Sequence, residues 1–101
     1  MVKIVAPTTQ KDKQLGLLIL DKPPQDWGML FFDTSTIHTM NMKFPIDVVS
    51  LDINFKIIEI KTIDPGVESY SIPGTKHILE LAPTSAYKLG FTIGSYLTLK
   101  I

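Results

Sequence analysis

The sequence predicts a mainly β domain of the α+β class, a single compact domain of about six or seven short strands with one or two short helices. Three observations predict this class. Short apolar runs rich in β-branched residues recur along the chain, proline and glycine separate them, and helical patterns occur only near each end. Strands with few helices favour a curled antiparallel or mixed sheet, or a partly closed barrel, over a doubly wound parallel sheet.

Length and composition limit the class of protein. The 101 residues support one domain, residues 1–101, with a single core, and 45% hydrophobic with 20% charged residues is typical of a globular chain. Ten basic residues balance ten acidic ones, so no overall field attracts nucleic acid or anionic lipid. No apolar stretch approaches the ~18 residues of a membrane span, and cysteine is absent. We therefore expect a cytoplasmic domain without a signal peptide, a membrane anchor or a cofactor.

The first elements are a strand and a short helix. Residues 3–6 are a strand candidate that ends before a proline. A side-chain oxygen of Thr8 or Thr9 can then cap a helix over residues 11–18. A strand over residues 15–20 is the alternative, because a glycine inside the helix costs about 1 kcal/mol relative to alanine.

Two strands are predicted before the middle of the chain. Residues 29–32 are apolar and too few for a helix, which indicates a buried strand. Residues 37–42 also favour a strand, whose period of two places His38, Met40 and Met42 on one face.

An antiparallel hairpin of residues 46–51 and 56–63 is the clearest prediction, since its second half is rich in isoleucine. Residues 64–74 hold two prolines, two glycines and two serines, and they predict a long loop that is mobile or part of a site. Residues 75–81 predict a further strand.

The last part of the chain predicts a helix and a final strand. Residues 83–89 place proline in a first helical turn, and glycine follows the last turn. Residues 96–101 alternate as a half-buried strand does.

Asp47 is the residue that an ordinary core does not explain. It stands inside the apolar run 46–51, where a carboxylate is costly unless it is paired or hydrogen-bonded. It could accept backbone amides from a neighbouring loop, or it could be a base or a ligand anchor. Because buried polar groups are mostly satisfied by the backbone, we favour the structural role.

His38 and His77 are the only histidines, and hence the only side chains with an ordinary pKa near neutrality. A pair of His38 and Asp47 would look like half of a hydrolytic relay, but no Gly-x-Ser-x-Gly elbow or cysteine supplies a nucleophile. Glu80 stands between two leucines, and we interpret this alternation as a strand whose polar face, with Glu80 on it, is exposed.

The expected face of His38, Met40 and Met42 offers imidazole and thioether ligands, a soft set that suits Cu(I). Methionine on a strand is more commonly flexible core filling, so we predict no metal. The aromatic residues are interpreted as core and rim, because a stacking platform for nucleic acid needs basic residues beside it.

Several blocks in a fixed order resemble one family. They are Gly-Leu-Leu at 16–18, Gly-Met-Leu-Phe at 28–31, His-Thr at 38–39, Phe-Pro-Ile-Asp-Val-Val at 44–49, His-Ile-Leu-Glu-Leu at 77–81 and Lys-Leu-Gly at 88–90. Their order and spacing resemble the bacterial and archaeal domain-of-unknown-function family 192 over residues 15–99. That family has a recognisable pattern and no settled activity, so the resemblance implies a kind of domain without implying a reaction.

Three positions depart from the family's pattern. Leu20 stands where many members have an arginine, Thr84 where a glycine is common, and Ser95 where a Gly-Asp pair has its aspartate. If those polar groups form the family's site, this chain has lost part of it. If the site is the region from His38 to Asp47, this chain retains it.

The sequence contains no complete catalytic set, so we predict a non-enzymatic ligand-binding or accessory module for an unknown small molecule or protein partner. Its pocket would lie near residues 64–74, and the candidate ligand-binding residues are Asp33, His38, Asn41, Asp47 and His77. The alternative is an acid-base or hydrolase-like enzyme that uses His38 and Asp47. A second alternative is copper binding by His38, Met40 and Met42.

Overall fold

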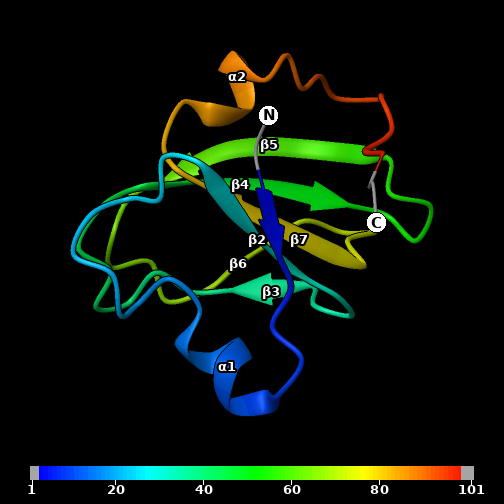
Figure 1. The fold of residues 1–101 in the computed structure, drawn as a ribbon. Coiled ribbons are helices and arrows are strands. Elements are labelled where there is room, and N and C mark those ends of the chain that lie inside the picture. The colour runs from blue at the N-terminus through cyan, green and yellow to red at the C-terminus, as the bar shows by residue number, and fades with distance from the viewer. Residues whose placement is uncertain (1–2, 99–101) are drawn as a thin grey trace.

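A five-stranded mixed sheet organises the computed structural model, which describes residues 3–98 (Figure 1). Its strands lie in the order β1-β2-β7-β4-β5, and β3 and β6 pair separately. The elements are β1 (Lys3–Val5), α1 (Gln10–Leu15), β2 (Trp27–Phe31), β3 (Thr36–Ile37), β4 (Ile46–Leu51), β5 (Ile57–Ile63), β6 (Tyr70–Ser71), β7 (His77–Leu81) and α2 (Ser85–Lys88). The predicted mainly β single domain is confirmed, and its sheet is open rather than closed into a barrel.

The pairing of the strands places β7 in the middle of the sheet. β1 runs parallel to β2, whereas the pairs β2 with β7, β7 with β4 and β4 with β5 are antiparallel. The predicted hairpin of residues 46–51 and 56–63 is confirmed as β4 and β5, in which Ile46 lies opposite Ile63. Every side chain of β7 is buried.

Two apolar clusters cover the two faces of the sheet. The period of two places Ile78 and Glu80 of β7 on one face and His77, Leu79 and Leu81 on the other. The first face packs on the cluster of Leu17, Ile37, Met42, Phe44, Ile46, Val48, Ile63 and Ile78, and we call it the α1 side. The other face, the α2 side, packs on Leu30, Val49, Leu51, Ile57, Leu79, Leu81 and Ala86. In Figure 1, α1 and α2 lie at opposite ends of the molecule.

The first helix is shorter than predicted. Thr9 caps α1, because its side chain accepts a hydrogen bond of 3.0 Å from the Asp12 amide. The expected extent to residue 18 is wrong, since Gly16 adopts a φ of 47° and ends the helix after Leu15.

Neither α1 nor α2, the helices within residues 3–98, is long and apolar enough to cross a membrane.

The predicted strand over residues 37–42 is wrong beyond its first residue. β3 ends at Ile37, and Asn41 adopts a φ of 65°, which belongs to a turn and not to a strand. Met40 is exposed and Met42 is buried in the core of the α1 side. His38, Met40 and Met42 therefore do not share a strand face.

The C-terminal predictions are confirmed only in part. The helix expected over residues 83–89 is reduced to α2, and Gly90 follows it with a φ of 77°. Of the expected strand over residues 96–101, Tyr96 makes a single bridge to Lys56, and residues 99–101 lie outside the described part of the chain.

Residues 64–74, predicted as a long loop, contain a short strand and are hydrogen-bonded to Thr39. The short strand β6 lies within them, and fully buried Thr39 binds their first turn. The Thr39 hydroxyl donates to the Asp64 carbonyl (2.6 Å) and accepts from the Val67 amide (2.9 Å). The Thr39 backbone also exchanges hydrogen bonds with Val67 and Gly66. The segment is therefore anchored to the chain that follows β3.

We expect Thr39→Val to destabilise the domain by about 3 kcal/mol, because it leaves the Asp64 carbonyl and the Val67 amide without their side-chain partner. Thr39→Ser keeps the hydroxyl and should cost about 1 kcal/mol, the scale of one lost methyl group. Urea unfolding midpoints measure both. A midpoint for Thr39→Val within error of wild type would contradict this role.

Candidate functional site

A hollow of about 420 Å³ opens on the α1 side, between α1 and the turn that follows β2. One wall is formed by α1 and residues 15–18, and the other by residues 33–38. Phe31, Met42 and Glu80 also line it. We call this cavity the α1 hollow.

Glu80 is the buried ionisable group of the α1 hollow. It lies between Met29 of β2 and Val48 of β4, and 6% of it is exposed. Within residues 3–98, no side chain or amide donates a hydrogen bond to its carboxyl group. Burial raises the pKa of Glu80 to about 8. At neutral pH the carboxyl group is therefore mostly protonated, and it can both donate and accept a hydrogen bond.

The interpretation of Glu80 as part of an exposed strand face is wrong. Alternation of polar and apolar residues predicts one wet face only where a strand has solvent on that side. β7 is covered on both faces, so its polar residues are buried with its leucines. Glu80 is thus a functional candidate that the sequence pattern did not predict.

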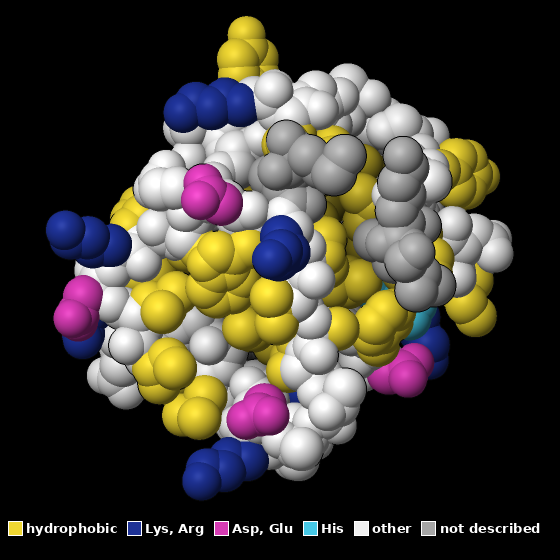
Figure 2. All heavy atoms as spheres, viewed as in Figure 1, with side chains coloured by type: hydrophobic (Ala, Val, Ile, Leu, Met, Phe, Trp, Pro, Cys, Tyr) yellow, Lys and Arg dark blue, Asp and Glu magenta, His cyan; other side chains and the backbone are white. Residues whose placement is uncertain are grey.

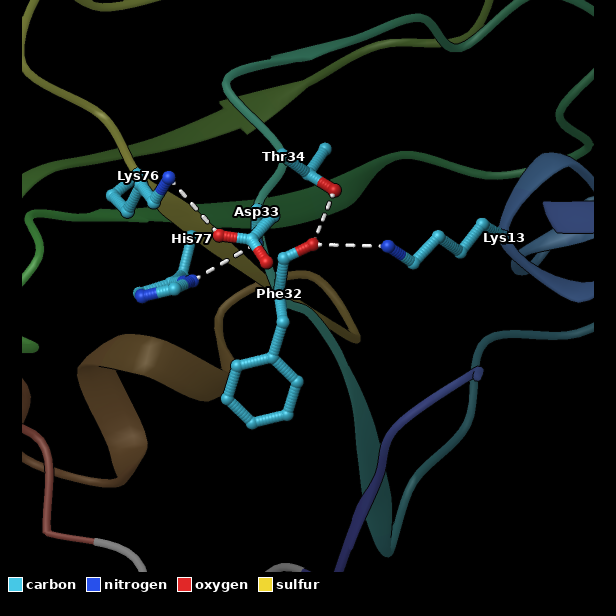
Figure 3. A network of polar contacts seen from close by, with 6 residues as sticks. All are labelled: Lys13, Phe32, Asp33, Thr34, Lys76 and His77. Atoms are coloured by element: carbon cyan, nitrogen blue, oxygen red, sulfur yellow. Dashed lines mark hydrogen bonds and ion pairs between the residues drawn. The ribbon is translucent and has the colours of Figure 1, made fainter. Parts of the chain in front are cut away.

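The rim of the α1 hollow is a turn held by polar contacts from several elements (Figure 3). The Phe32 carbonyl accepts hydrogen bonds from Lys13 Nζ of α1 (3.2 Å) and from the Thr34 hydroxyl (3.0 Å). The Asp33 carboxylate pairs with Lys76 Nζ at 3.0 Å, and Asp33 itself has a φ of 51°. These contacts fix both the turn and its distance from α1.

His77 holds the same turn from the α2 side of the sheet. Its Nδ1 accepts a hydrogen bond of 3.0 Å from the Asp33 amide, as Figure 3 shows. Its ring stacks on Phe55 with centroids 4.7 Å apart and meets the edge of Phe32. Burial lowers the pKa of His77, which keeps the imidazole neutral and Nδ1 able to accept. His77 therefore positions the rim without lining the hollow.

Asp47 lies on the α2 side and is 2% exposed. One carboxylate oxygen accepts a hydrogen bond from the Thr62 hydroxyl (2.6 Å), and the other accepts from the Ala86 amide (3.0 Å). These bonds join β4 to β5 and to α2. Asp47 thus has a hydrogen-bond donor for each oxygen, which Glu80 lacks within residues 3–98.

The sequence-predicted candidates fall into two groups. Asp33 and His38 line the α1 hollow, whereas Asn41, Asp47 and His77 do not. His38 and Asp47 are not brought together, because His38 lies at the hollow on the α1 side and its Nδ1 accepts from the Met40 amide. Residues 64–74, expected near the ligand, do not line the hollow either.

The three residues of the copper alternative, His38, Met40 and Met42, do not all line one cavity. His38 and Met42 line the hollow, and Met40 is exposed outside it. Among residues 3–98, no three His, Asp or Glu side chains are grouped as metal ligands would be.

The three departures from the family's pattern lie at defined places. Leu20 packs against the cluster of the α1 side. Thr84 adopts a φ of 70°, a left-handed conformation that glycine adopts without the steric cost of a Cβ. The Ser95 hydroxyl donates to the Thr92 carbonyl in a turn at 2.7 Å.

We expect Asp47→Ala to destabilise the domain by about 2–4 kcal/mol, because the buried Ala86 amide and the Thr62 hydroxyl lose their acceptor. Asp47→Asn should cost about 1 kcal/mol, since its carbonyl can face Ala86 while the Thr62 hydroxyl rotates to accept from the amide group. Urea midpoints at pH 7 rank the variants, with exposed Asp26→Ala as the control. Equal midpoints for Asp47→Ala and wild type would show that Asp47 is not a structural carboxylate.

Glu80 should make the stability of the domain fall as the pH rises. The folded protein keeps the Glu80 proton up to a pH of about 8, whereas the unfolded chain releases it near 4.5. Between these values the unfolded state binds fewer protons, so the free energy of unfolding declines by at most about 5 kcal/mol and then levels off. His77 acts in the opposite direction and at lower pH, because its lowered pKa removes stability as the pH falls below about 6.5.

The variant Glu80→Gln tests this linkage. It keeps the shape of the side chain without a titrating group, so its unfolding free energy should not decline from pH 5 to 8.5 and should exceed that of wild type at pH 8.5. Urea unfolding across this range is the measurement, and Glu68→Gln, at an exposed glutamate, is the control. Parallel curves for Glu80→Gln and wild type would contradict the buried titration.

Comparison with known proteins gives a family and a fold. A search among curated proteins gives no significant match. A "putative transcription regulator" from Sinorhizobium meliloti 1021 superposes with a TM-score of 0.81 at 22% identity, covering 94% of this chain and 79% of its own. A protein of unknown function from Novosphingobium aromaticivorans DSM 12444 gives 0.84 at 20% identity, covering 97% and 75%. These likenesses show the fold alone. The model of domain-of-unknown-function family 192 (DUF192, "Uncharacterized ACR") matches residues 1–99, and the chain therefore belongs to that family.

Proposed function

We propose that this domain is a non-enzymatic binding module and that its ligand is a small organic molecule held in the α1 hollow. The observation that supports the proposal is Glu80, a buried carboxyl group without a hydrogen-bond donor from residues 3–98, at a cavity of about 420 Å³. A carboxyl group that is largely removed from water without a hydrogen bond is costly, and folded proteins leave few polar groups in that state. A ligand that bonds to Glu80 would offset that cost.

The surroundings of both histidines favour binding over acid-base catalysis. Nδ1 of His38 accepts from the Met40 amide, and Nδ1 of His77 accepts from the Asp33 amide. Within residues 3–98, neither imidazole is hydrogen-bonded to a hydroxyl group or to a carboxylate, as the base of a nucleophilic relay would be. We therefore place the enzyme alternative second.

Charge does not favour a nucleic-acid partner, although one structural neighbour is described as a putative transcription regulator. All ten basic residues are lysines, and ten acidic residues balance them. On the face seen in Figure 2, lysine and acidic side chains are dispersed around an apolar area and form no basic stripe. A small-molecule ligand in the cytoplasm is the form of the proposal that suits this surface and the absence of cysteine.

The experiment is an NMR titration of the ¹⁵N-labelled protein with four probe classes: small amines, amides, carboxylic acids and alcohols. We expect at least one class to bind and to shift the amide signals of residues 10–18, 33–38 and 80. Ser35→Trp, which adds a bulky side chain at an exposed residue that lines the hollow, should weaken that binding at least tenfold. Ser69→Trp, at an exposed serine away from the hollow, is the matched control. Shifts confined to the α2 side, or no binding at millimolar probe, would contradict the proposal.

A further inference from the structure

Within residues 3–98, no cationic side chain pairs with the carboxyl group of Glu80 to stabilise its ionised form. The chain has no arginine, and Lys13, the lysine that lines the α1 hollow, already donates to the Phe32 carbonyl. Burial raises the pKa of Glu80, and no opposing charge from residues 3–98 lowers it again. The missing counter-charge is therefore one that a ligand can supply.

The other groups of the hollow suit a cation attached to an apolar stem. Phe31 and Met42 line the cavity with an aromatic ring and a thioether, and a cation is attracted to the face of such a ring. Leu17 and Ile37 add aliphatic surface for a stem. An anionic ligand could accept a hydrogen bond only from the protonated form of Glu80 and would be repelled by its ionised form.

The remaining titratable groups around Glu80 lie at the rim or are neutral. Lys13 comes from α1, and Asp33 and His38 come from the turn after β2 and from the residue after β3. The strand neighbours of Glu80, Met29 and Val48, do not titrate. Tyr70 of β6 packs on the cluster of the α1 side, and burial raises its pKa, so it stays neutral.

Beyond β4 on the same face of the sheet, Lys61 and Glu59 of β5 are the next charged side chains, since Val48 lies opposite Lys61. Val48 therefore separates Lys61 from Glu80. Glu80 is the buried titratable residue among those that line the hollow within residues 3–98. Its carboxyl group can gain or lose a proton without breaking a hydrogen bond to those residues.

We infer that the α1 hollow selects organic cations, a guanidinium or ammonium group on a short apolar stem, and that the bound cation replaces the proton of Glu80. The proton passes to the solvent, so the charge inside the hollow is the same before and after binding. This inference rests on the proposed function, because it names the ligand class of that same site. A free amine or guanidine and a side chain that carries the same group would offer the same cation to Glu80, and the affinity of a peptide distinguishes the two sources.

Exchange of a proton for a cation makes binding depend on pH. With the pKa of Glu80 at about 8, roughly nine-tenths of the empty sites are protonated at pH 7 and roughly one-tenth at pH 9. A permanently charged ligand should therefore bind about tenfold more tightly at pH 9 and release close to one proton at pH 7. A neutral ligand of the same shape should show neither effect.

The experiment compares n-butylguanidinium with n-butylurea, which has nearly the same shape and no charge. Isothermal titration calorimetry in buffers of different ionisation enthalpy, at pH 7 and pH 9, reports affinity and proton release together. In wild type at pH 9 we expect n-butylguanidinium to bind at least tenfold more tightly than n-butylurea, and about tenfold more tightly than it does at pH 7. Glu80→Gln should remove this preference and the proton release, whereas Glu68→Gln should keep both.

Other outcomes would overturn the cation assignment. Equal binding of the two probes, or unchanged binding of n-butylguanidinium to Glu80→Gln, would do so and leave the proposed binding function intact. Failure of both probes to bind would also overturn it, while the four-class NMR titration reports separately on the proposed function. Ser35→Trp should weaken both probes if they occupy the hollow, and urea unfolding confirms that each variant is folded. A lysine- or arginine-containing peptide is a further arm: binding at least as tight as that of n-butylguanidinium indicates a side-chain source, and weaker binding indicates a free small molecule.

Discussion

The central position of β7 determines most of what is unusual in this domain. β7 is hydrogen-bonded to β2 on one edge and to β4 on the other, and both of its faces are covered. Any polar side chain in this strand is therefore taken out of water regardless of the face it occupies. The buried His77 accepts a hydrogen bond from the Asp33 amide and stacks on Phe55. The buried Glu80 has neither kind of contact within residues 3–98, and at the α1 hollow it stays protonated at neutral pH. Desolvation of one strand thus accounts for the shifted pKa values of both residues.

The parts of the fold that could be predicted are those that depend on neighbouring residues. The β4 and β5 hairpin has a local apolar pattern and a short connection, and Thr9 caps α1 through an amide only three residues further along the chain. The burial of Glu80 could not be predicted in the same way, because it depends on β2 and β4 pairing with β7 from distant parts of the chain. One signal was present, since Glu80 stands in an apolar run much as Asp47 does, and a carboxylate is equally costly there.

Two buried carboxyl groups on neighbouring strands illustrate how one sheet can use the same chemistry differently. Asp47 lies opposite Leu81, the residue next to Glu80, yet the two carboxyl groups are on opposite faces. Asp47 has a donor for each oxygen and joins β4 to β5 and α2. The prediction of a structural role for Asp47 depended on backbone donors, and the Ala86 amide is such a donor. The alternative pair of His38 and Asp47 does not form, because His38 follows the end of β3 at the α1 hollow, whereas the Asp47 side chain lies on the α2 side of β4.

The separation of the two faces has a consequence for how members of this family can diverge. Residues that bind α2 to the sheet lie on one side, and residues that shape the α1 hollow lie on the other, with β7 contributing to both. Substitutions that reshape the hollow therefore leave the α2 packing in place, so the lining of the hollow can vary on a constant scaffold. The residue that limits this freedom is His77, because it reaches across to hold the turn at the rim.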